Sequence, residues 1–447
     1  MPCRLCASPA EKAGGTAIQE KGLEGNMTAT PHYDSYLNIL REELLPALGC
    51  TEPIAVALAS AKAMEALGEP PVECRAEVSG NIIKNVKAVT VPNTGGLRGI
   101  EAAVTAGIVG GRPELGLEVL SRVTPEEISA MGNFLRDCPI HVLPAEGDRI
   151  FYIRITLRSA GHTAGCEIAD YHTNITRIWR DEACLYQGGS GQSAQTDRSV
   201  LSVEEIVAFA DTMDSRDAAP VLERQIACNT AISREGLKGG WGAEVGRTLL
   251  RLHGDRLDVR LRAAAAAGSD ARMNGCKLPV IIVSGSGNQG MTASLPVIEY
   301  ANAIGADHDR LLRALALADL ITIHQKTGIG RLSGFCGATS TGCGAACGIA
   351  YLDDGDADLI SRTITNTLGI CSGMICDGAK SSCAAKIAAA VEAGLEGYEM
   401  AKSGQGFAEG EGIIGADVEQ TIANVGRLAR QGMRQTDVEI LHIMLGM

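Results

Sequence analysis

Six cysteines stand among glycine, alanine and serine in two neighbouring stretches, TGIGRLSGFCGATSTGCGAACG (327–348) and GICSGMICDGAKSSCAAK (369–386). They are Cys336, Cys343, Cys347, Cys371, Cys376 and Cys383. Thiolates are soft metal ligands, and loops of small residues let the backbone come close to an inorganic cluster. The two stretches therefore predict either a metal centre or a core that packs closely through small side chains.

The composition describes a globular chain with more than one hydrophobic core. The chain has 447 residues, which is more than one core usually serves, so we expect two domains. Hydrophobic residues make up 45% and charged residues 21%, values typical of a folded and well-buried protein. Aromatic residues reach only 3% while glycine occupies 54 positions, which favours closely packed helices and tight loops.

Charge and apolar runs narrow the choice of partners. The net charge is −13 and the Lys and Arg residues do not cluster, so we expect no nucleic-acid partner. A small amino-acid substrate stays compatible, because a local pocket can be positive on an acidic protein. The best apolar run, Leu311 to Ile323, is broken by Arg313 and Asp319, so we expect no membrane span.

The cysteine usage is typical of a reducing compartment. The 15 cysteines show no regular disulfide spacing, and the first residues, MPCRLCASPAEKAGG, contain no apolar signal segment. Cys3 and Cys6 form a single C-x-x-C pair, which is a weak metal signal without a second pair. We therefore expect a cytoplasmic protein with free or metal-bound thiols.

The order of the patterns predicts an α+β, helix-rich fold, in which an N-terminal α/β part packs on a mainly α-helical domain. Residues 1–30 are expected to be a disordered tail. Residues 31–190 are expected to form the N-terminal α/β domain, and residues 198–447 the mainly helical domain. The polar, glycine-rich sequence GGSGQSAQTD (188–197) is the expected linker between them.

Periodicity and capping signals assign the elements within these parts. Helical spacing begins at Tyr33 and continues to Gly68, a residue that commonly ends helices. Residues 72–91 are expected to form short strands, and residues 138–186 are the most strand-like region. The capping box that begins at Thr124 opens another helix. A further box, Ser202 to Glu205, begins the helical second half.

The sequence Gly285-Ser-Gly-Asn-Gln-Gly290 matches the G-x-G-x-x-G dinucleotide fingerprint after a strand-like run. That fingerprint should be followed by a second strand ending in an acidic residue, whereas residues 307–324 have helical spacing. NAD binding is therefore disfavoured. We expect instead a nest of backbone N–H groups that binds a carboxylate, with an empty tight turn as the alternative.

Two further loops, SGNIIKN (79–85) and VPNTGG (91–96), also join small polar side chains to glycine. Three such loops in one chain favour a pocket for an amino acid or carboxylate. The candidate substrate-binding residues are Ser79, Gly80, Asn81, Asn93, Thr94, Ser284, Ser286, Gly287, Asn288 and Gln289.

Three thiolates suffice for a [4Fe–4S] cluster if one iron is left for the substrate, and several cysteine triplets fit by spacing alone. Cys343 and Cys347 are four residues apart among alanines, which indicates buried positions on one helical face. A structural zinc site remains an alternative, but it would usually show a C-x-x-C pair that this region lacks.

Six segments together resemble a known family. They are LPALGCTEP (45–53), SGNIIKN, VPNTGG, SGSGNQG (284–290), TGIGRLSGFCGA (327–338) and GMICDGAKSSCAAK (373–386). From about Tyr33 onward the chain resembles the L-cysteine desulfidase family, relatives of the iron–sulfur L-serine dehydratase alpha chain. The resemblance implies a carbon–sulfur lyase that needs no pyridoxal phosphate and converts L-cysteine to hydrogen sulfide, ammonia and pyruvate. Serine and other β-substituted amino acids remain alternative substrates.

The resemblance also implies residue roles. It places a [4Fe–4S] cluster on Cys336, Cys376 and Cys383, and the catalytic base on Cys50. A thiolate at Cys50 would be favoured at a helix N-terminus, although Glu52 would oppose it if its side chain points inward. The remaining catalytic candidate, a proton shuttle, is His324, the histidine nearest the cysteine stretches in sequence.

These roles place the active site between the two parts, because the base and the cluster ligands come from opposite ends of the chain. Two rival classes remain: a cluster-bearing sensor, for which no DNA-binding pattern is visible, and the disfavoured NAD oxidoreductase. A homodimer is the commonest state of such enzymes.

Overall fold

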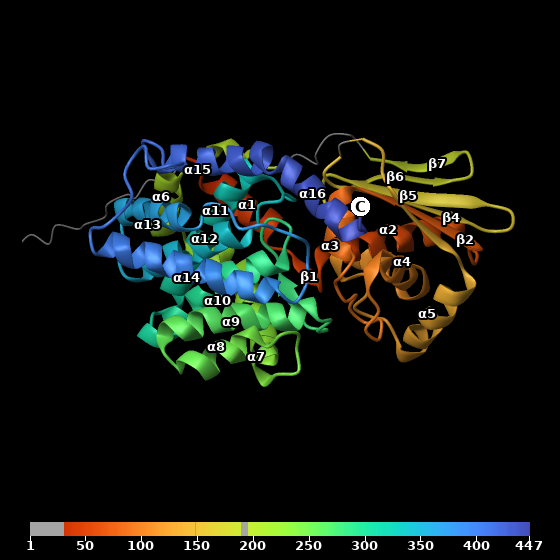
Figure 1. The fold of residues 1–447 in the computed structure, drawn as a ribbon, viewed down its shortest axis with the longest axis horizontal. Helices are drawn as coiled ribbons and strands as arrows, with labels where there is room; N and C mark the ends of the chain where they lie inside the picture. The colour runs from red at the N-terminus through yellow and green to blue at the C-terminus, as the bar shows by residue number, and fades with distance from the viewer. Residues whose placement is uncertain (1–30, 148, 189–194) are drawn as a thin grey trace, which may run out of the picture.

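The computed structural model describes residues 31–147, 149–188 and 195–447. The tail expected over residues 1–30, with Cys3 and Cys6, lies outside these residues. The fold is α+β and helix-rich, as predicted, with a sheet at one end of the molecule and a helical body at the other (Figure 1).

A mixed six-stranded sheet, in the order β3-β2-β4-β5-β6-β7, forms the N-terminal part. Its strands are β2 (Glu73–Val78), β3 (Ile140–Pro144), β4 (Tyr152–Arg158), β5 (Thr163–Ala169), β6 (Ile175–Arg180) and β7 (Ala183–Gln187). β2 runs parallel to β3, and the other neighbouring pairs are antiparallel. Helices α2 (Thr51–Leu67) and α4 (Gly99–Gly110) pack beside the sheet, with α2 in contact with β4, β5 and β6.

Small residues allow these two helices to approach closely. A Cβ atom added to Gly107 on α4 would lie 2.2 Å from the Ala57 carbonyl oxygen on α2, so only glycine fits there. A 3₁₀ turn, η1 (Pro113–Glu118), leads on to α5 (Pro125–Asp137). Helix α5 begins with the predicted capping box, in which the Thr124 and Glu127 side chains each accept a hydrogen bond from the other residue's backbone N–H.

The segment 72–91, expected to form short strands, is partly helical. After β2 the chain forms α3 (Gly80–Val86), so the strand prediction was wrong for this part. The β-branched residues that suggested a strand, Ile82, Ile83 and Val86, are all buried. Their i, i+1, i+4 spacing places them on one side of a helix, and burial of that side overrides their strand propensity.

Most of the second half is a closely packed helical body. Its helices are α6 (Val203–Thr212), α7 (Ser215–Lys238), α8 (Val245–His253), α9 (Leu257–Met273), α10 (Gly287–Ile304), α11 (His308–Ile329), α12 (Ala338–Leu352), α13 (Ala357–Ile370), α14 (Cys383–Lys402) and α15 (Val418–Arg427). Two short turns, η2 (Arg198–Val200) and η3 (Leu428–Gly432), complete it. A Cβ atom at Gly342 would lie 2.3 Å from the Ala390 carbonyl oxygen, which explains the small residues of α12 and α14.

The chain crosses between the two parts at both of its described ends. Helix α1 (Tyr33–Glu43) packs in the helical body, where the Tyr36 ring lies 5.3 Å from that of Phe209. The short strand β1 (Pro46–Leu48) then pairs antiparallel with β8 (Pro279–Ile281). These contacts fix the start of α2 beside the helical body.

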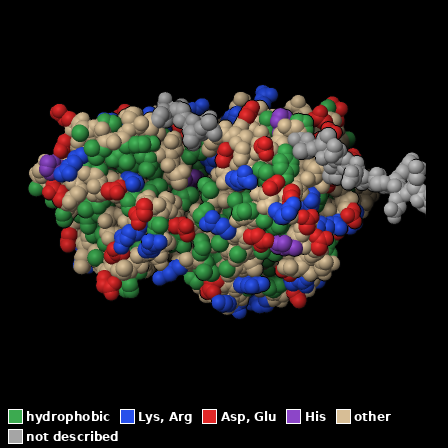
Figure 2. All heavy atoms as spheres, turned by 180° about the vertical axis from the view of Figure 1, so that it is seen from behind, with side chains coloured by type: hydrophobic (Ala, Val, Ile, Leu, Met, Phe, Trp, Pro, Cys, Tyr) green, Lys and Arg blue, Asp and Glu red, His purple; other side chains and the backbone are tan. Residues whose placement is uncertain are grey.

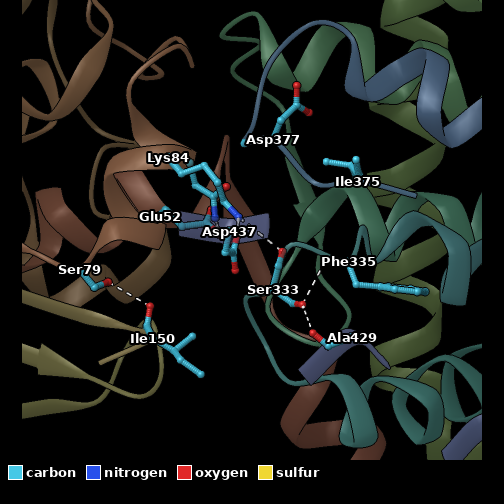
Figure 3. Close-up of polar contacts among 12 residues, drawn as sticks. Glu52, Ser79, Lys84, Ile150, Ser333, Phe335, Ile375, Asp377, Ala429 and Asp437 are labelled. Atoms are coloured by element: carbon cyan, nitrogen blue, oxygen red, sulfur yellow. Dashed lines mark hydrogen bonds and ion pairs between the residues drawn. The ribbon is translucent and has the colours of Figure 1, made fainter. Parts of the chain in front are cut away.

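The last helix, α16 (Arg434–Leu445), returns to the N-terminal part and packs against α3 (Figure 1). Lys84 of α3 forms an ion pair with Asp437, and its ammonium lies 3.5 Å from the Ser333 carbonyl oxygen (Figure 3). Lys87 donates to the Met444 carbonyl. Helix α16 therefore ties the two parts together on a second side.

Acidic and basic side chains are interspersed over the face shown in Figure 2. Within the described part of the chain, no helix combines the length and the apolar character that crossing a membrane requires.

Candidate active site

One cavity lies where the N-terminal part meets the helical body, which is where the sequence analysis expects the active site. Its N-terminal wall carries Cys50, Glu52, Asn85 and His172. Its helical wall carries Arg272, Ser286, Asn288, Gln289, Lys326, Cys336, Cys376 and Cys383. In the same region, Figure 3 shows Glu52 and Lys84 opposite the loops that hold Phe335 and Ile375.

Two cysteine loops are fastened to one another at the cavity. The Cys336 backbone N–H donates to the Met374 carbonyl at 2.7 Å, and the Cys376 N–H donates to the Gly334 carbonyl at 2.7 Å. Phe335 forms an isolated antiparallel bridge with the opposite loop. These backbone bonds place the two thiols on the same wall although they are 40 residues apart in sequence.

The third thiol, Cys383, is the first residue of α14 and also faces the cavity. The loop before it passes directly over α3. Gly378 has a positive φ of 95°, and a Cβ atom there would lie 2.2 Å from the Lys84 carbonyl oxygen. Glycine is therefore required for the cysteine loop to reach this position.

The three thiols that line this wall are the donor type of an iron–sulfur cluster. Among residues 31–147, 149–188 and 195–447, no three His, Cys, Asp or Glu side chains converge closely enough to hold one metal ion. A zinc ion requires its ligands at about 2.0–2.3 Å, whereas a four-iron cluster is itself several ångströms across and takes thiolates from further apart. Cys336, Cys376 and Cys383 remain the candidate cluster ligands.

The surroundings favour the thiolate at Cys376, whereas the hydrogen bond to Cys376 raises the pKa of Cys336 and burial raises the pKa of Cys383. A hydrogen bond from Cys336 lowers the pKa of Cys376 to about 6, with the Lys84 charge acting in the same direction. Burial lowers the pKa of Lys326, which lines the same cavity, to about 8, and the two thiols oppose that shift. Soft thiolates beside buried cations are a suitable donor set for an anionic iron–sulfur cluster.

The other cysteines of the two stretches do not line the cavity. Cys343 and Cys347 lie inside α12 with no exposed surface and pack in the hydrophobic core of the helical body. Cys371 ends α13, where its sulfur lies 3.7 Å from the Thr339 hydroxyl.

The opposite wall presents Cys50, the residue just before α2, with Glu52 turned towards it. The Cys50 thiol donates to Glu52 Oε2 at 3.1 Å. Burial, followed by the negative charge of Glu52, raises the pKa of Cys50 well above its ordinary value, although the Arg272 guanidinium acts in the other direction. The helix N-terminus therefore does not produce the expected thiolate, because the thiol is buried and the glutamate points inward.

Arg272, at the end of α9, is a cavity residue that the sequence reasoning missed. Its side chain is only 2% exposed, and its Nη1 donates to Asn288 Oδ1 at 3.1 Å. Its Nε and Nη2 atoms have no hydrogen-bond partner among the described residues. An arginine inside the alanine-rich run LRAAAAAGSDARM (261–273) was the available signal, since a buried charge requires a partner.

The glycine-rich fingerprint forms part of this wall. Ser286, Asn288 and Gln289 line the cavity at the start of α10. Gly287 leaves room for the guanidinium, because a Cβ atom there would lie 2.5 Å from Arg272 Nε. Ser284, in contrast, lines a neighbouring cavity.

The other predicted substrate-binding residues, at the start of α3 and in the loop 91–96, do not line the cavity. The Ser79 hydroxyl donates to the Ile150 carbonyl at 3.0 Å (Figure 3), and Gly80 packs against α16. The Asn93 amide donates to the Leu120 carbonyl at 2.8 Å, and the Thr94 hydroxyl donates to the Val91 carbonyl at 2.7 Å. Asn81 is likewise not among the lining residues, whereas Asn85 of the same segment is.

His324 does not line the cavity. Its Nε2 lies 2.7 Å from Glu419 Oε2, in an ion pair between α11 and α15. The histidine that does line the cavity is His172, which follows β5 and which the sequence reasoning did not single out. Nearness in sequence to the cysteines was a poor guide, because the wall opposite them comes from another part of the chain.

Fold and site together define a helical body with a three-thiol cavity, and comparison with known proteins identifies its class. The chain belongs to the serine dehydratase alpha chain family, which matches residues 114–442, and thus to a family of iron–sulfur lyases. It is 52% identical over 417 residues to a UPF0597 protein of Desulfitobacterium hafniense (strain Y51), covering 93% of this chain and 97% of that protein. A UPF0597 protein of Lachnoclostridium phytofermentans is 47% identical over 415 residues, covering 92% of this chain and 100% of its own length.

Proposed function

We propose that this lyase catalyses β-elimination of L-cysteine to hydrogen sulfide, ammonia and pyruvate with a [4Fe–4S] cluster and without pyridoxal phosphate. The observation that carries the proposal is the division of one cavity between two walls. One wall presents the thiols of Cys336, Cys376 and Cys383, and the other presents Cys50 beside Glu52. Such an elimination needs a leaving-group acceptor and a proton acceptor on different sides of a small substrate.

The three thiols would hold the cluster through three of its irons. When bound, the cluster supplies a Lewis-acidic iron without a cysteine ligand, which suits a soft sulfur leaving group. The free thiols of all 13 described cysteines support a reducing, cytoplasmic setting for such a centre.

The protein's own residues bind and orient the amino acid. Arg272 lines the cavity, and its Nε and Nη2 atoms, which have no partner among the described residues, form a fork that suits a carboxylate, while Asn288 accepts from Nη1. Held in this way, the α-proton faces the N-terminal wall with Cys50. Phe335 and Ile387 contribute apolar surface that limits water in the cavity.

L-Serine dehydration is the second candidate function. The specific observation that favours it is the match of residues 114–442 to the serine dehydratase alpha chain family. The same cavity chemistry serves both substrates, with water in place of sulfide as the leaving group. The preference for cysteine is supported by the GCTEP segment around Cys50, which resembles the desulfidase family.

The proposal is tested on anaerobically purified, cluster-replete protein. We expect sulfide release from L-cysteine to exceed pyruvate release from L-serine in kcat/KM, and we expect no inhibition by carbonyl reagents that trap pyridoxal phosphate. The Cys336→Ala variant should lose both the broad visible absorption of the cluster and the activity, because it lacks one of the three cysteine ligands.

Cys343→Ala is the matched control, since that thiol is buried in α12 away from the cavity. It should keep the absorption and turnover. Full activity in an iron-free Cys336→Ala protein would refute the cluster assignment, and faster serine turnover would establish the second candidate instead.

A further inference from the structure

The Glu52 carboxylate is buried in the cavity wall and held there by hydrogen bonds to its neighbours. It is 7% exposed and accepts hydrogen bonds from the Cys50 thiol at 3.1 Å, the Thr51 hydroxyl at 3.1 Å and the Asn85 amide at 3.3 Å. His172 Nε2 lies 3.8 Å from Glu52 Oε1. Three hydrogen bonds, one of them from the Cys50 thiol, therefore hold this buried carboxylate in place.

This carboxylate is also tied to the opposite wall. The Thr51 hydroxyl lies 2.9 Å from the Gly285 carbonyl oxygen, which precedes the substrate-facing start of α10. His172 in turn packs edge-on against Phe151, with ring centroids 4.7 Å apart. The geometry of the Cys50–Glu52 pair is thus held from both parts of the molecule.

Cys50 and Glu52 share one proton, and when this proton is on the Cys50 sulfur, Cys50 cannot act as a base. Burial would raise the pKa of Glu52, but His172 and the Cys50 thiol lower it to about 2. Burial and Glu52 raise the pKa of Cys50. The resting pair is consequently a neutral thiol and an ionised carboxylate, and a neutral thiol cannot accept the α-proton unless its own proton leaves.

We propose that Cys50 and Glu52 act as one base, in which the thiol proton passes to Glu52 Oε2 while the Cys50 sulfur takes the substrate α-proton. One S–H bond breaks and another forms, an O–H bond forms on Glu52, and the Cα–H electron pair moves into the substrate to expel the leaving group. The negative charge moves from Glu52 to the departing group, so protons and charge balance. The proposal rests on the β-elimination proposed above.

The groups that face the pair act on it in opposite directions, because Arg272 favours loss of the Cys50 proton whereas His172 favours the ionised form of Glu52. Arg272 of α9 faces Cys50, and His172 faces Glu52 from the loop after β5. The proton passes within an existing hydrogen bond, because the Cys50 sulfur and Glu52 Oε2 already lie 3.1 Å apart. Glu52 is a positioning and proton-accepting residue that acts through Cys50, which is the group expected to touch the substrate.

The experiment compares Glu52→Gln with wild type as anaerobic holoenzyme. The first readout is exchange of the α-proton of L-alanine with D₂O, followed by NMR, because alanine has no leaving group. We expect Glu52→Gln to slow exchange and L-cysteine turnover by about 100-fold, with KM changed less than about threefold. Iodoacetamide labelling of Cys50 at pH 7.5 should rise by roughly tenfold, because removal of the carboxylate charge lowers the thiol pKa.

Glu167→Gln is the matched control, since Glu167 lies on β5 and pairs with Arg154 at 3.5 Å, away from the cavity. It should leave all three readouts unchanged. Glu52→Gln with wild-type exchange, or with unchanged Cys50 labelling, overturns the paired base. A wild type that exchanges alanine through Glu52 but releases nothing from cysteine or serine overturns the proposed function and leaves the paired base intact.

Discussion

At the scale of single residues, Arg272 explains why this cavity should recognise a carboxylate. A guanidinium that is 2% exposed, with two nitrogens that lack partners among the described residues, is costly to maintain unless a ligand completes its hydrogen bonds. The neighbouring Gly287 provides the space that the guanidinium occupies. The folded chain thus holds a cationic fork in place before any substrate arrives.

Arg272→Lys should weaken carboxylate binding by about 10- to 100-fold, because a lysine cannot reproduce the two parallel N–H donors. The measurement is inhibition by two cysteine fragments. 3-Mercaptopropionate carries the carboxylate, and its inhibition constant should rise, whereas that of cysteamine, which lacks it, should stay within about threefold.

Arg247→Lys on α8 serves as the control, since Arg247 is 48% exposed and pairs with Glu244 on the surface. It should alter neither inhibition constant. Equal weakening of both fragments by Arg272→Lys would show that the arginine supports the cavity rather than the carboxylate.

At the scale of secondary structure, α11 contains an acid that burial keeps protonated. Asp319 has no exposed surface, and burial raises its pKa to about 8, against the hydrogen bond from Gln225 at 3.1 Å. Because the folded-state pKa is raised above the unfolded value, its contribution to stability is complete below about pH 4 and is lost as the pH rises towards 8. Helix α11 is therefore stabilised by mild acid at this position.

Asp319→Asn should remove this loss. The variant should be more stable than wild type by an amount that is small near pH 4 and grows to on the order of 2–4 kcal/mol near pH 8. The asparagine amide can also donate to Gln225 Oε1, which has no partner among the described residues. Urea unfolding at several pH values measures the difference.

The control is Asp309 on the same helix, whose pKa is shifted in the opposite direction, downward. Asp309 pairs with Arg313 at 2.7 Å, and hydrogen bonds from Ser215 and Arg313 lower its pKa. Asp309→Asn should therefore give no gain at pH 8. An Asp319→Asn gain that is the same at pH 5 and pH 8 would mean that the effect is not due to ionisation.

The elements themselves were predictable where the signal is local. The capping box at Thr124 begins α5 as expected, and the Ser202 hydroxyl caps α6, although Glu205 accepts from Tyr36 and does not complete a second box. Helix α3 was mistaken for a strand because its β-branched residues favour strands locally, whereas tertiary packing buries them on one side of a helix. Arg272 and His172 could not be placed, because their partners are brought together by the tertiary fold.

The prediction of the site follows the same division. The sequence motifs placed Cys50, Ser286, Asn288 and the three candidate ligand cysteines, and the structure brings all of these to one cavity. Motif resemblance alone could not distinguish residues that shape a turn, such as Asn93, from residues that face a ligand. That distinction requires knowing which side of each loop meets the opposite wall.

At the scale of the whole molecule, the two parts are closed by the contact between α3 and α16. Lys84 is 2% exposed and Asp437 is 19% exposed. Water therefore cannot solvate the Lys84 ammonium if the Asp437 carboxylate is removed. Removing one member of a buried pair leaves an uncompensated charge, which costs more than the pair itself contributes. Helix α16 therefore packs stably only where Asp437 can reach Lys84, which requires that the two parts are correctly aligned.

Asp437→Asn should destabilise cluster-free protein by about 1–3 kcal/mol, whereas the double variant Lys84→Met, Asp437→Leu should recover most of the loss. Urea unfolding measures both, and limited proteolysis should cut near α16 faster in the single variant. The control is Glu235→Gln, which removes a surface ion pair with Lys238, whose side chain is 71% exposed. It should lower the free energy of unfolding by less than about 0.5 kcal/mol. Equal loss in the single and double variants would contradict the buried-charge argument.

The same contact sets an order of events during synthesis. Asp437 follows Lys84 by 353 residues, which at 5–20 residues per second is a delay of about 18 to 70 s. All three candidate ligand cysteines leave the ribosome before α16 does. The contact between α3 and α16 is thus completed only after all three thiols have been synthesised.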